Sequence, residues 1–184
     1  MVRIIMYTKP GSENPDSGPS GQAEKTRPLT TSKAAWEERN KQPGWRDASG
    51  QVDSKPVHKI GAIIIRDRRL LLVKKKEGPY IILPGGKLEA GENAHECLAR
   101  ELSEELSMAV VSSARFETFQ DIGVYGSHPL KIDAYFVQAI GEPRPGSEIS
   151  EALWFHTKHP EADRLSSILQ KFVVPRLVKM GLID

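Results

Sequence analysis

Three glutamates stand close together in one segment of this 184-residue chain: Glu101, Glu104 and Glu105, within the run RELSEELSM. Their spacing is i, i+3 and i+4, which places them in one arc of an α-helix. Like charges at this spacing repel one another, so something positive is expected to complete the cluster. Mg²⁺ binds to carboxylate oxygens arranged in this way. The pattern predicts a divalent-cation site, and the alternative is a solvated acidic helix face.

A helix is predicted from Ala94 to Leu106 to carry these glutamates. Asn93 suits the N-cap, and Glu96 three residues later completes a capping box. A neighbouring face, roughly 100° around the helix, holds leucines that can be buried: Leu98, Leu102 and Leu106. The helix can therefore pack into a core while its carboxylates point together into a cleft.

Strands are predicted on both sides of this helix. A hairpin is expected from Val57–Arg66 and Leu70–Lys75, and a short strand, Tyr80–Leu83, leads into Pro84-Gly85-Gly86. The other expected strands are 109–120, 130–140 and 153–156. Apolar residues at helical spacing predict a C-terminal amphipathic helix with a core-facing stripe: Leu165, Ile168, Leu169, Phe172, Val173 and Leu177. Strands interleaved with two helices predict an α/β domain with a mixed sheet.

Composition limits the class of protein. Lys plus Arg total 26 and Asp plus Glu total 24, so the net charge is only +2, which disfavours a general nucleic-acid binder. The single cysteine, Cys97, excludes a disulfide framework and a multi-cysteine metal site. The sequence contains no apolar run as long as the ~18 residues of a membrane span. The opening segment MVRIIMYTKPG is too short for a signal peptide, so a cytoplasmic protein without a membrane partner is expected.

The composition changes near residue 55. Residues 1–55 are expected to form a flexible extension, because the stretch from Pro10 to Gly21 is mostly Pro, Gly, Ser and acidic residues. Residues 56–184 are expected to form the folded domain. Trp36 and Trp45 leave other roles open for the extension: a lid, partner docking or a homodimer contact.

From Gly86 to Met108 the chain resembles the signature of the Nudix (MutT-like) hydrolases, G-x5-E-x7-R-E-U-x-E-E-x-G-U, where U is a bulky apolar residue. Gly86, Glu92 and the run RELSEELSM match every fixed position except one, because Ser107 replaces the last glycine. Helices often end on a left-handed residue, and serine in that conformation costs roughly 1–2 kcal/mol. The departure removes no metal ligand.

The resemblance implies a Nudix-like α/β/α sandwich and the hydrolysis, at phosphorus, of a nucleoside diphosphate linked to another group. It implies that Glu101, Glu104 and Glu105 hold Mg²⁺ or Mn²⁺, with the backbone carbonyl of Gly86 as a further ligand. Such a cation would neutralise phosphate charge and activate a bound water.

The resemblance also suggests roles in positioning and in proton transfer. Arg100 would orient the glutamates, and Glu92 would tie the loop to the helix. The general base in this family is either a glutamate of the motif, here Glu101 or Glu104, or an acid from a later loop. The later candidates are Glu148 and Glu151, of which Glu148 is favoured.

The substrate is less constrained than the reaction. A nucleoside triphosphate, including an oxidised one, is the first choice, followed by ADP-ribose or another nucleotide sugar and by dinucleoside polyphosphates. A nucleotide-binding module without hydrolysis is the alternative of another class. The run Lys74–Lys76 would attract a triphosphate or simply protect an edge strand. Tyr80, Tyr125 and Phe136 would stack a base or pack in the fold.

Overall fold

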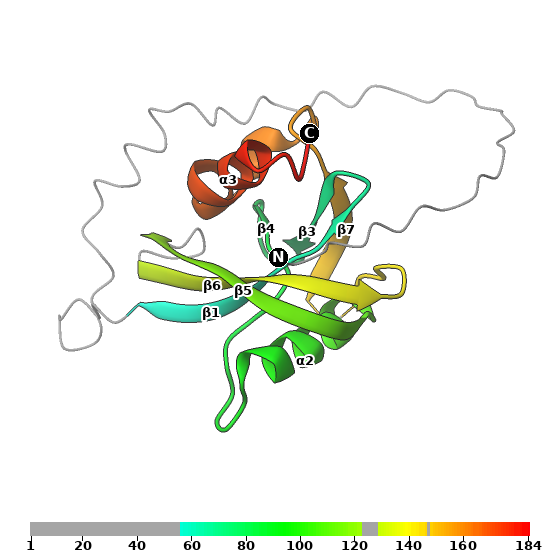
Figure 1. Ribbon diagram of the computed structural model, residues 1–184, viewed down its shortest axis with the longest axis vertical. Coiled ribbons are helices and arrows are strands. Elements are labelled where there is room, and N and C mark those ends of the chain that lie inside the picture. Colours follow the sequence, from blue (N-terminus) through cyan, green and yellow to red (C-terminus); the bar gives the residue numbers. More distant parts are fainter. Residues whose placement is uncertain (1–55, 123–128, 147) are drawn as a thin grey trace, which may run out of the picture.

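The computed structural model describes residues 56–122, 129–146 and 148–184 (Figure 1). Expectations for the N-terminal extension and for Tyr125 fall outside these residues. The strands are β1 (Val57–Ile63), β2 (Ile65–Arg66), β3 (Arg69–Lys75), β4 (Ile81–Ile82), β5 (Ala109–Ile122), β6 (Pro129–Ile140) and β7 (Ile149–Phe155). The helical elements are α2 (Ala94–Leu106), a 3₁₀ turn (Ala162–Arg164), a π turn (Leu169–Val173) and α3 (Val174–Lys179).

Two sheets form the centre of the domain. The first has the order β1-β6-β5; β1 is parallel to β6, and β5 is antiparallel to β6, so this sheet is mixed. In the second sheet β3 pairs antiparallel with β2, β4 and β7. The expected mixed sheet is therefore present, but it contains only part of the strands.

The strand expected over residues 57–66 is interrupted at Ile64. Its first part, β1, joins the first sheet, and β2 joins the second. One apolar run thus passes from one sheet to the other, and only β2 forms the hairpin with β3. The turn of that hairpin is Asp67-Arg68, with φ of 48° and 60°, and Arg69 already belongs to β3. Positive φ at both central residues fits the twist of a two-residue hairpin.

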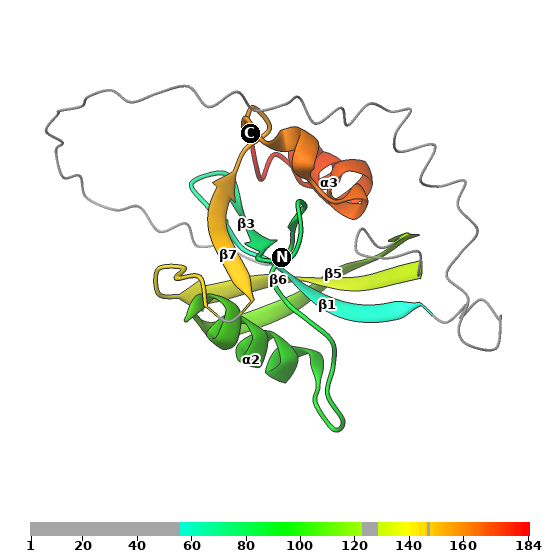
Figure 2. The same cartoon turned by 180° about the vertical axis from the view of Figure 1, so that it is seen from behind.

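Helices cover the sheets from opposite sides (Figures 1 and 2). Helix α2 packs on the β1-β6-β5 sheet through a fully buried row that includes the three predicted leucines and Cys97. A second core cluster joins Ile63 and Phe155 to the C-terminal helical residues Leu169, Val173 and Leu177. These layers confirm the expected α/β sandwich.

The local signals around α2 act as expected. The Asn93 side chain accepts N–H bonds from His95 and Glu96, and the Glu96 side chain accepts the N–H of Asn93, which completes the capping box. At the other end Ser107 is left-handed, with φ 54° and ψ 35°. Its N–H bonds to Leu102 and Ser103 carbonyls, so the helix ends where the signature usually has glycine.

The C-terminal helix differs from the expectation in two ways. Leu165 lies before the helix and bridges Ile81, and Phe172 is 37% exposed instead of core-facing. The exposure of Phe172 accompanies a wide turn in which the N–H of Val174 reaches the carbonyl of Leu169. Pro175 follows at once; its ring is incompatible with a regular turn, so the widened turn shifts the helical phase.

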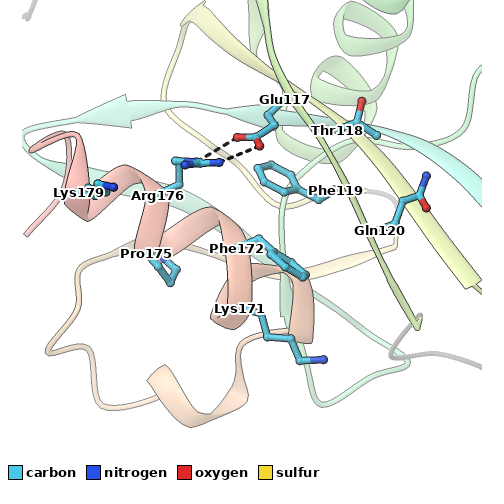
Figure 3. Close-up of a pocket in the computed structure, with 9 residues that line it drawn as sticks. All are labelled: Glu117, Thr118, Phe119, Gln120, Lys171, Phe172, Pro175, Arg176 and Lys179. Atoms are coloured by element: carbon cyan, nitrogen blue, oxygen red, sulfur yellow. Dashed lines mark hydrogen bonds and ion pairs between the residues drawn. The ribbon is translucent and has the colours of Figure 1, made fainter.

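A groove of about 410 Å³ lies between β5 and this helix (Figure 3). Phe119 and Phe172 stack there with centroids 6.0 Å apart, and Arg176 pairs with Glu117 at 2.9 Å. The groove contains none of the residues of the acidic cluster. Within the described part of the chain, no helix is long and apolar enough to cross a membrane.

Candidate active site

The loop Pro84-Gly85-Gly86 lies directly on β1. The N–H of Ile60 donates to the Gly86 carbonyl at 2.8 Å, and the N–H of Ala62 donates to Pro84 at 2.9 Å. Gly85 has φ of 126°, and a Cβ there would lie 2.3 Å from the Ile60 carbonyl oxygen. Only glycine fits this close approach. The Gly86 carbonyl also accepts a long contact of 4.0 Å from the Cys97 thiol. The resemblance implies that the same oxygen contacts the metal.

Glu105 points into the interior beneath this loop. The residue is 2% exposed, and its Oε2 accepts the N–H of Gly85 at 2.9 Å. Its Oε1 is buried and has no hydrogen-bond partner. Burial raises the pKa of Glu105 to about 7, while the Gly85 N–H and Lys75 act in the opposite direction. A buried carboxylate oxygen without a partner is costly, and a bound cation would satisfy it.

Glu101 is pressed against the same loop. A Cβ on Gly86 would lie 1.8 Å from Glu101 Oε1, so the glycine makes room for this carboxylate. Arg100 Nη1 lies 2.9 Å from the same oxygen, and 3.7 Å from Oε2 of Glu104. Glu104 is the most open of the three acids; its side chain is 57% exposed against 14% for Glu101.

Arg100 connects the helix to the preceding loop. Its Nε and Nη2 bind both carboxylate oxygens of Glu92, at 2.9 and 3.0 Å, and Nη2 also donates to the Lys87 carbonyl. This pair lowers the pKa of Glu92 to about 2. Arg100 thus contacts Glu92, Glu101 and Glu104 at once, which is the geometry that the resemblance implies. Its part in a reaction stays a prediction.

The two later candidates for a base lie in different settings. Glu148 stands in the turn before β7, is 55% exposed at its side chain, and forms an ion pair with Lys75. Its charge contributes to the raised pKa of Glu105. The two segments meet at the backbone, where the N–H of Gly146 donates to the Glu105 carbonyl at 2.9 Å. Glu151 lies within β7, not in a loop, and pairs with Lys74 at 2.8 Å.

The edge-strand interpretation of the lysine run is wrong. Strand β3 is flanked by β7 on one side and by β2 and β4 on the other, so it is central. The side chains of Lys74 and Lys75 are only 12% and 17% exposed, and both are engaged in ion pairs. Phe136 packs on Phe116 at 4.8 Å, which supports its packing role. Cys97 is fully buried, and burial raises the pKa of its thiol to about 12, as expected of a packed residue.

Lys59 was missed by the sequence analysis. It lies on β1, next to the residue that bonds to Gly86, and it is half-buried. Burial and the charge of Lys75 lower its pKa, and the charges of Glu105, Glu148 and Lys87 also reach it. A lysine between a histidine and an isoleucine in a strand gives no local signal of function. The charged groups around Lys59 come from distant segments of the chain.

The residues present fit a divalent cation. Two observations at the Gly85-Gly86 loop support this fit. Oε1 of Glu105 is buried without a partner, and Gly86 leaves room for the Glu101 carboxylate. In the described ranges, however, no three Asp, Glu, His or Cys side chains already converge as a ligand set. Arg100 holds Glu101, and Gly85 holds one oxygen of Glu105, so these contacts account for the present orientations.

Comparison with known proteins identifies the family. The family model for the NUDIX domain matches residues 55–173, and the chain belongs to this family. It is 33% identical over 110 residues to an 8-oxo-dGTP diphosphatase of Haemophilus influenzae, covering 54% of this chain and 76% of that protein. It is also 31% identical over 111 residues to an ADP-ribose pyrophosphatase of Methanocaldococcus jannaschii, covering 54% of this chain and 62% of the relative.

Solved structures agree with the fold. A MutT NUDIX hydrolase from Burkholderia pseudomallei matches with a TM-score of 0.50 and 30% identity, over 55% of this chain and 83% of that one. A NUDIX hydrolase from Nitrosomonas europaea matches with a TM-score of 0.58 over 70% of this chain and 92% of that one. Its identity is 19%, so this second likeness concerns the fold alone.

Proposed function

We propose that this chain is a pyrophosphohydrolase that uses Mg²⁺ or Mn²⁺ and acts on nucleoside triphosphates, including oxidised deoxynucleotides. Divalent-cation dependence is general in the family, and the choice of these two ions is part of the proposal. The observation that carries it is the buried, unpartnered Oε1 of Glu105 beside Glu101 and the Gly86 loop. Buried polar atoms without a partner are rare in folded proteins, and a bound cation would complete this one.

Each residue of the cluster has a task in this proposal. Glu101, Glu104 and Glu105 hold the cation, with the Gly86 carbonyl beside them. When bound, the cation supplies charge neutralisation of the phosphates and a water of lowered pKa. Arg100 fixes the orientation of Glu101 and ties it to Glu92 through contacts of 2.9 Å.

Glu148 is proposed to accept the proton of the attacking water. Two observations support this role: its side chain is open to solvent, and its charge contributes to the raised pKa of Glu105. Its carboxylate forms an ion pair with Lys75 in the resting protein. Glu101 and Glu104 are the competing candidates, and the pH profiles of Glu148→Gln and Glu104→Gln would separate them.

The choice of triphosphate follows the named relatives. Of the two relatives described above, the one that is 33% identical is an 8-oxo-dGTP diphosphatase. A second candidate, ADP-ribose, is supported by the 31% identity to an ADP-ribose pyrophosphatase. Both substrates contain a pyrophosphate bond, so the proposed acidic cluster serves either.

The test is product release from a nucleotide panel. The panel contains the four dNTPs, 8-oxo-dGTP, ADP-ribose and diadenosine tetraphosphate, each with Mg²⁺, with Mn²⁺ and with EDTA. Products are identified by chromatography, so that a nucleoside monophosphate plus pyrophosphate distinguishes the proposed reaction from phosphatase action. Cleavage of a triphosphate that EDTA abolishes supports the proposal. Tight nucleotide binding without turnover in either metal would instead show a binding module.

A further inference from the structure

Lys59 lies on β1, the strand of the first sheet to which the candidate metal loop is hydrogen-bonded. Ile60, its neighbour, donates its N–H to Gly86 at 2.8 Å and lies in the core beneath α2. Because side chains alternate along a strand, Lys59 leaves β1 on the opposite face. That face is shared with Gly61, at which a Cβ would lie 3.0 Å from Leu83, the residue preceding the loop.

The surroundings of Lys59 are unusual for a lysine in a folded protein. It is half-buried, and it forms no ion pair with any described residue. Lys75, whose charge has the largest influence on the pKa of Lys59, is already paired with Glu148. Desolvating an ammonium without pairing it costs stability, so a purely structural role is a poor explanation of this residue.

A bound cation changes the charge balance around Lys59. Two carboxylates reach it electrostatically, Glu105 and Glu148, and two further lysines do so, Lys75 and Lys87. If Glu105 neutralises a divalent cation and Glu148 stays with Lys75, no carboxylate is left to balance Lys59. A phosphate chain that approaches the cation would then supply the missing negative charge.

We propose that Lys59 is a phosphate-binding residue of the site, with its Nζ donating hydrogen bonds to non-bridging oxygens of the substrate. This inference rests on the proposed function, since it assigns a further contact to the same site. Lys59 approaches from the β1 side of the Gly86 loop, and the glutamates approach from the α2 side. The phosphate chain would therefore be held from two opposite walls.

The experiment compares Lys59→Met and Lys59→Arg in the full chain with a control, Lys179→Met, at an exposed position of α3. The probe is inorganic tripolyphosphate, titrated calorimetrically with Mg²⁺ and again with EDTA, so that the measurement needs neither turnover nor a particular base. The melting temperature of each ligand-free variant is measured in parallel.

Lys59→Met is expected to weaken tripolyphosphate binding roughly tenfold to a hundredfold, the effect of one charge-assisted hydrogen bond. Lys59→Arg keeps most of the affinity, and Lys179→Met keeps all of it. The ligand-free Lys59→Met protein should melt at the same temperature as the unmodified chain or higher, because a desolvated charge has been removed. A lower melting temperature with unchanged affinity would overturn the proposal and make Lys59 a structural partner of Glu105 and Glu148.

Failure of the proposed function gives a different result. If the unmodified chain hydrolyses nothing in the panel but loses tripolyphosphate binding in Lys59→Met, the phosphate contact stands and the reaction does not. If the chain hydrolyses a nucleotide and Lys59→Met matches it in KM, kcat and tripolyphosphate affinity, the reaction stands and the phosphate contact is refuted. A chain that binds no tripolyphosphate also refutes the contact.

Discussion

The N–H of Gly85 donates to Oε2 of Glu105 at 2.9 Å and leaves Oε1 of the same carboxylate buried without a partner. This single hydrogen bond from the loop fixes the orientation of the Glu105 carboxylate and leaves its Oε1 available. A left-handed glycine, with φ of 126°, is required to bring that N–H into place. The site is therefore prepared by the loop as much as by the helix.

Glu105→Gln is expected to reduce turnover by orders of magnitude while the fold remains intact. The amide can still accept the Gly85 N–H, but it lacks the charge that a cation requires. Steady-state kinetics with Mg²⁺ and a thermal melt would check this result. Glu77→Gln, at an exposed position after β3, is the matched control. Full activity in Glu105→Gln would remove this residue from the metal site.

The stability of the metal-free protein should depend on pH through Glu105. Its pKa is 4.5 in the unfolded chain and about 7 in the folded protein, so the folded protein holds the proton more tightly. The stabilisation is fully present below pH 4.5 and is lost as the pH rises through about 7, by up to about 3 kcal/mol.

The measurement is the free energy of unfolding in EDTA for the unmodified chain and for Glu105→Gln between pH 5 and about pH 8. The variant cannot ionise at this position, so its stability should exceed that of the unmodified chain increasingly as the pH rises. Mg²⁺ should reduce the difference, because it stabilises the ionised carboxylate. Parallel pH curves in EDTA would contradict the assigned cause.

Gly86→Ala is expected to displace Glu101 and to weaken cation binding. A Cβ at this position would lie 1.8 Å from Glu101 Oε1, and φ of Gly86 is not in the left-handed region, so the effect is steric. Mn²⁺ affinity, followed by electron paramagnetic resonance, should fall at least tenfold. The double variant Gly86→Ala with Glu101→Asp relieves the clash and serves as the test of cause. The melting temperatures of the single and the double variant are compared. If the double variant melts no higher than Gly86→Ala, the damage lies in the backbone and not in the clash with Glu101.

Local signals in the sequence predicted the parts of the fold that short segments determine. The capping box at Asn93, the buried leucines and the left-handed Ser107 all depend on neighbours within one helix. The interruption at Ile64 could not be read in this way, because it depends on which distant strand pairs with each half. The phase shift before Pro175 was also missed, since periodicity alone assumes regular turns.

In the candidate site, too, the sequence predicted what one short segment determines and missed what distant segments bring together. The three glutamates were found because they share one helix, but the Gly85–Glu105 bond joins residues twenty positions apart. Lys59 comes from β1, and Glu148 from the turn before β7. Their proximity follows from the tertiary packing of separate segments, for which a single sequence carries no periodic signal.

Arg100→Lys should lower activity and also loosen the loop. Lysine keeps the charge but cannot bind both oxygens of Glu92 while contacting Glu101 at 2.9 Å. We expect at least a tenfold fall in kcat/KM and faster amide exchange around Glu92. Glu92→Gln should reproduce the faster exchange and only part of the kinetic loss, because it leaves the Arg100–Glu101 contact in place. Equal kinetic losses would assign the whole effect to the loop.

Ser107→Gly should stabilise the domain without changing catalysis. Ser107 has φ 54° and ψ 35°, a conformation that glycine adopts without the steric cost borne by a side chain. Glycine also gains freedom in the unfolded chain, which offsets part of the benefit, so the expected net gain is about 0.5–1 kcal/mol. For a domain of this size that corresponds to a rise of roughly 2–4 °C in melting temperature. Ser107→Val should shift it in the opposite direction, and both variants should retain the kcat of the unmodified chain, since no ligand of the proposed cation is touched. A Ser107→Gly protein that melts lower would show that the serine hydroxyl or the rigidity of the turn matters more than backbone strain.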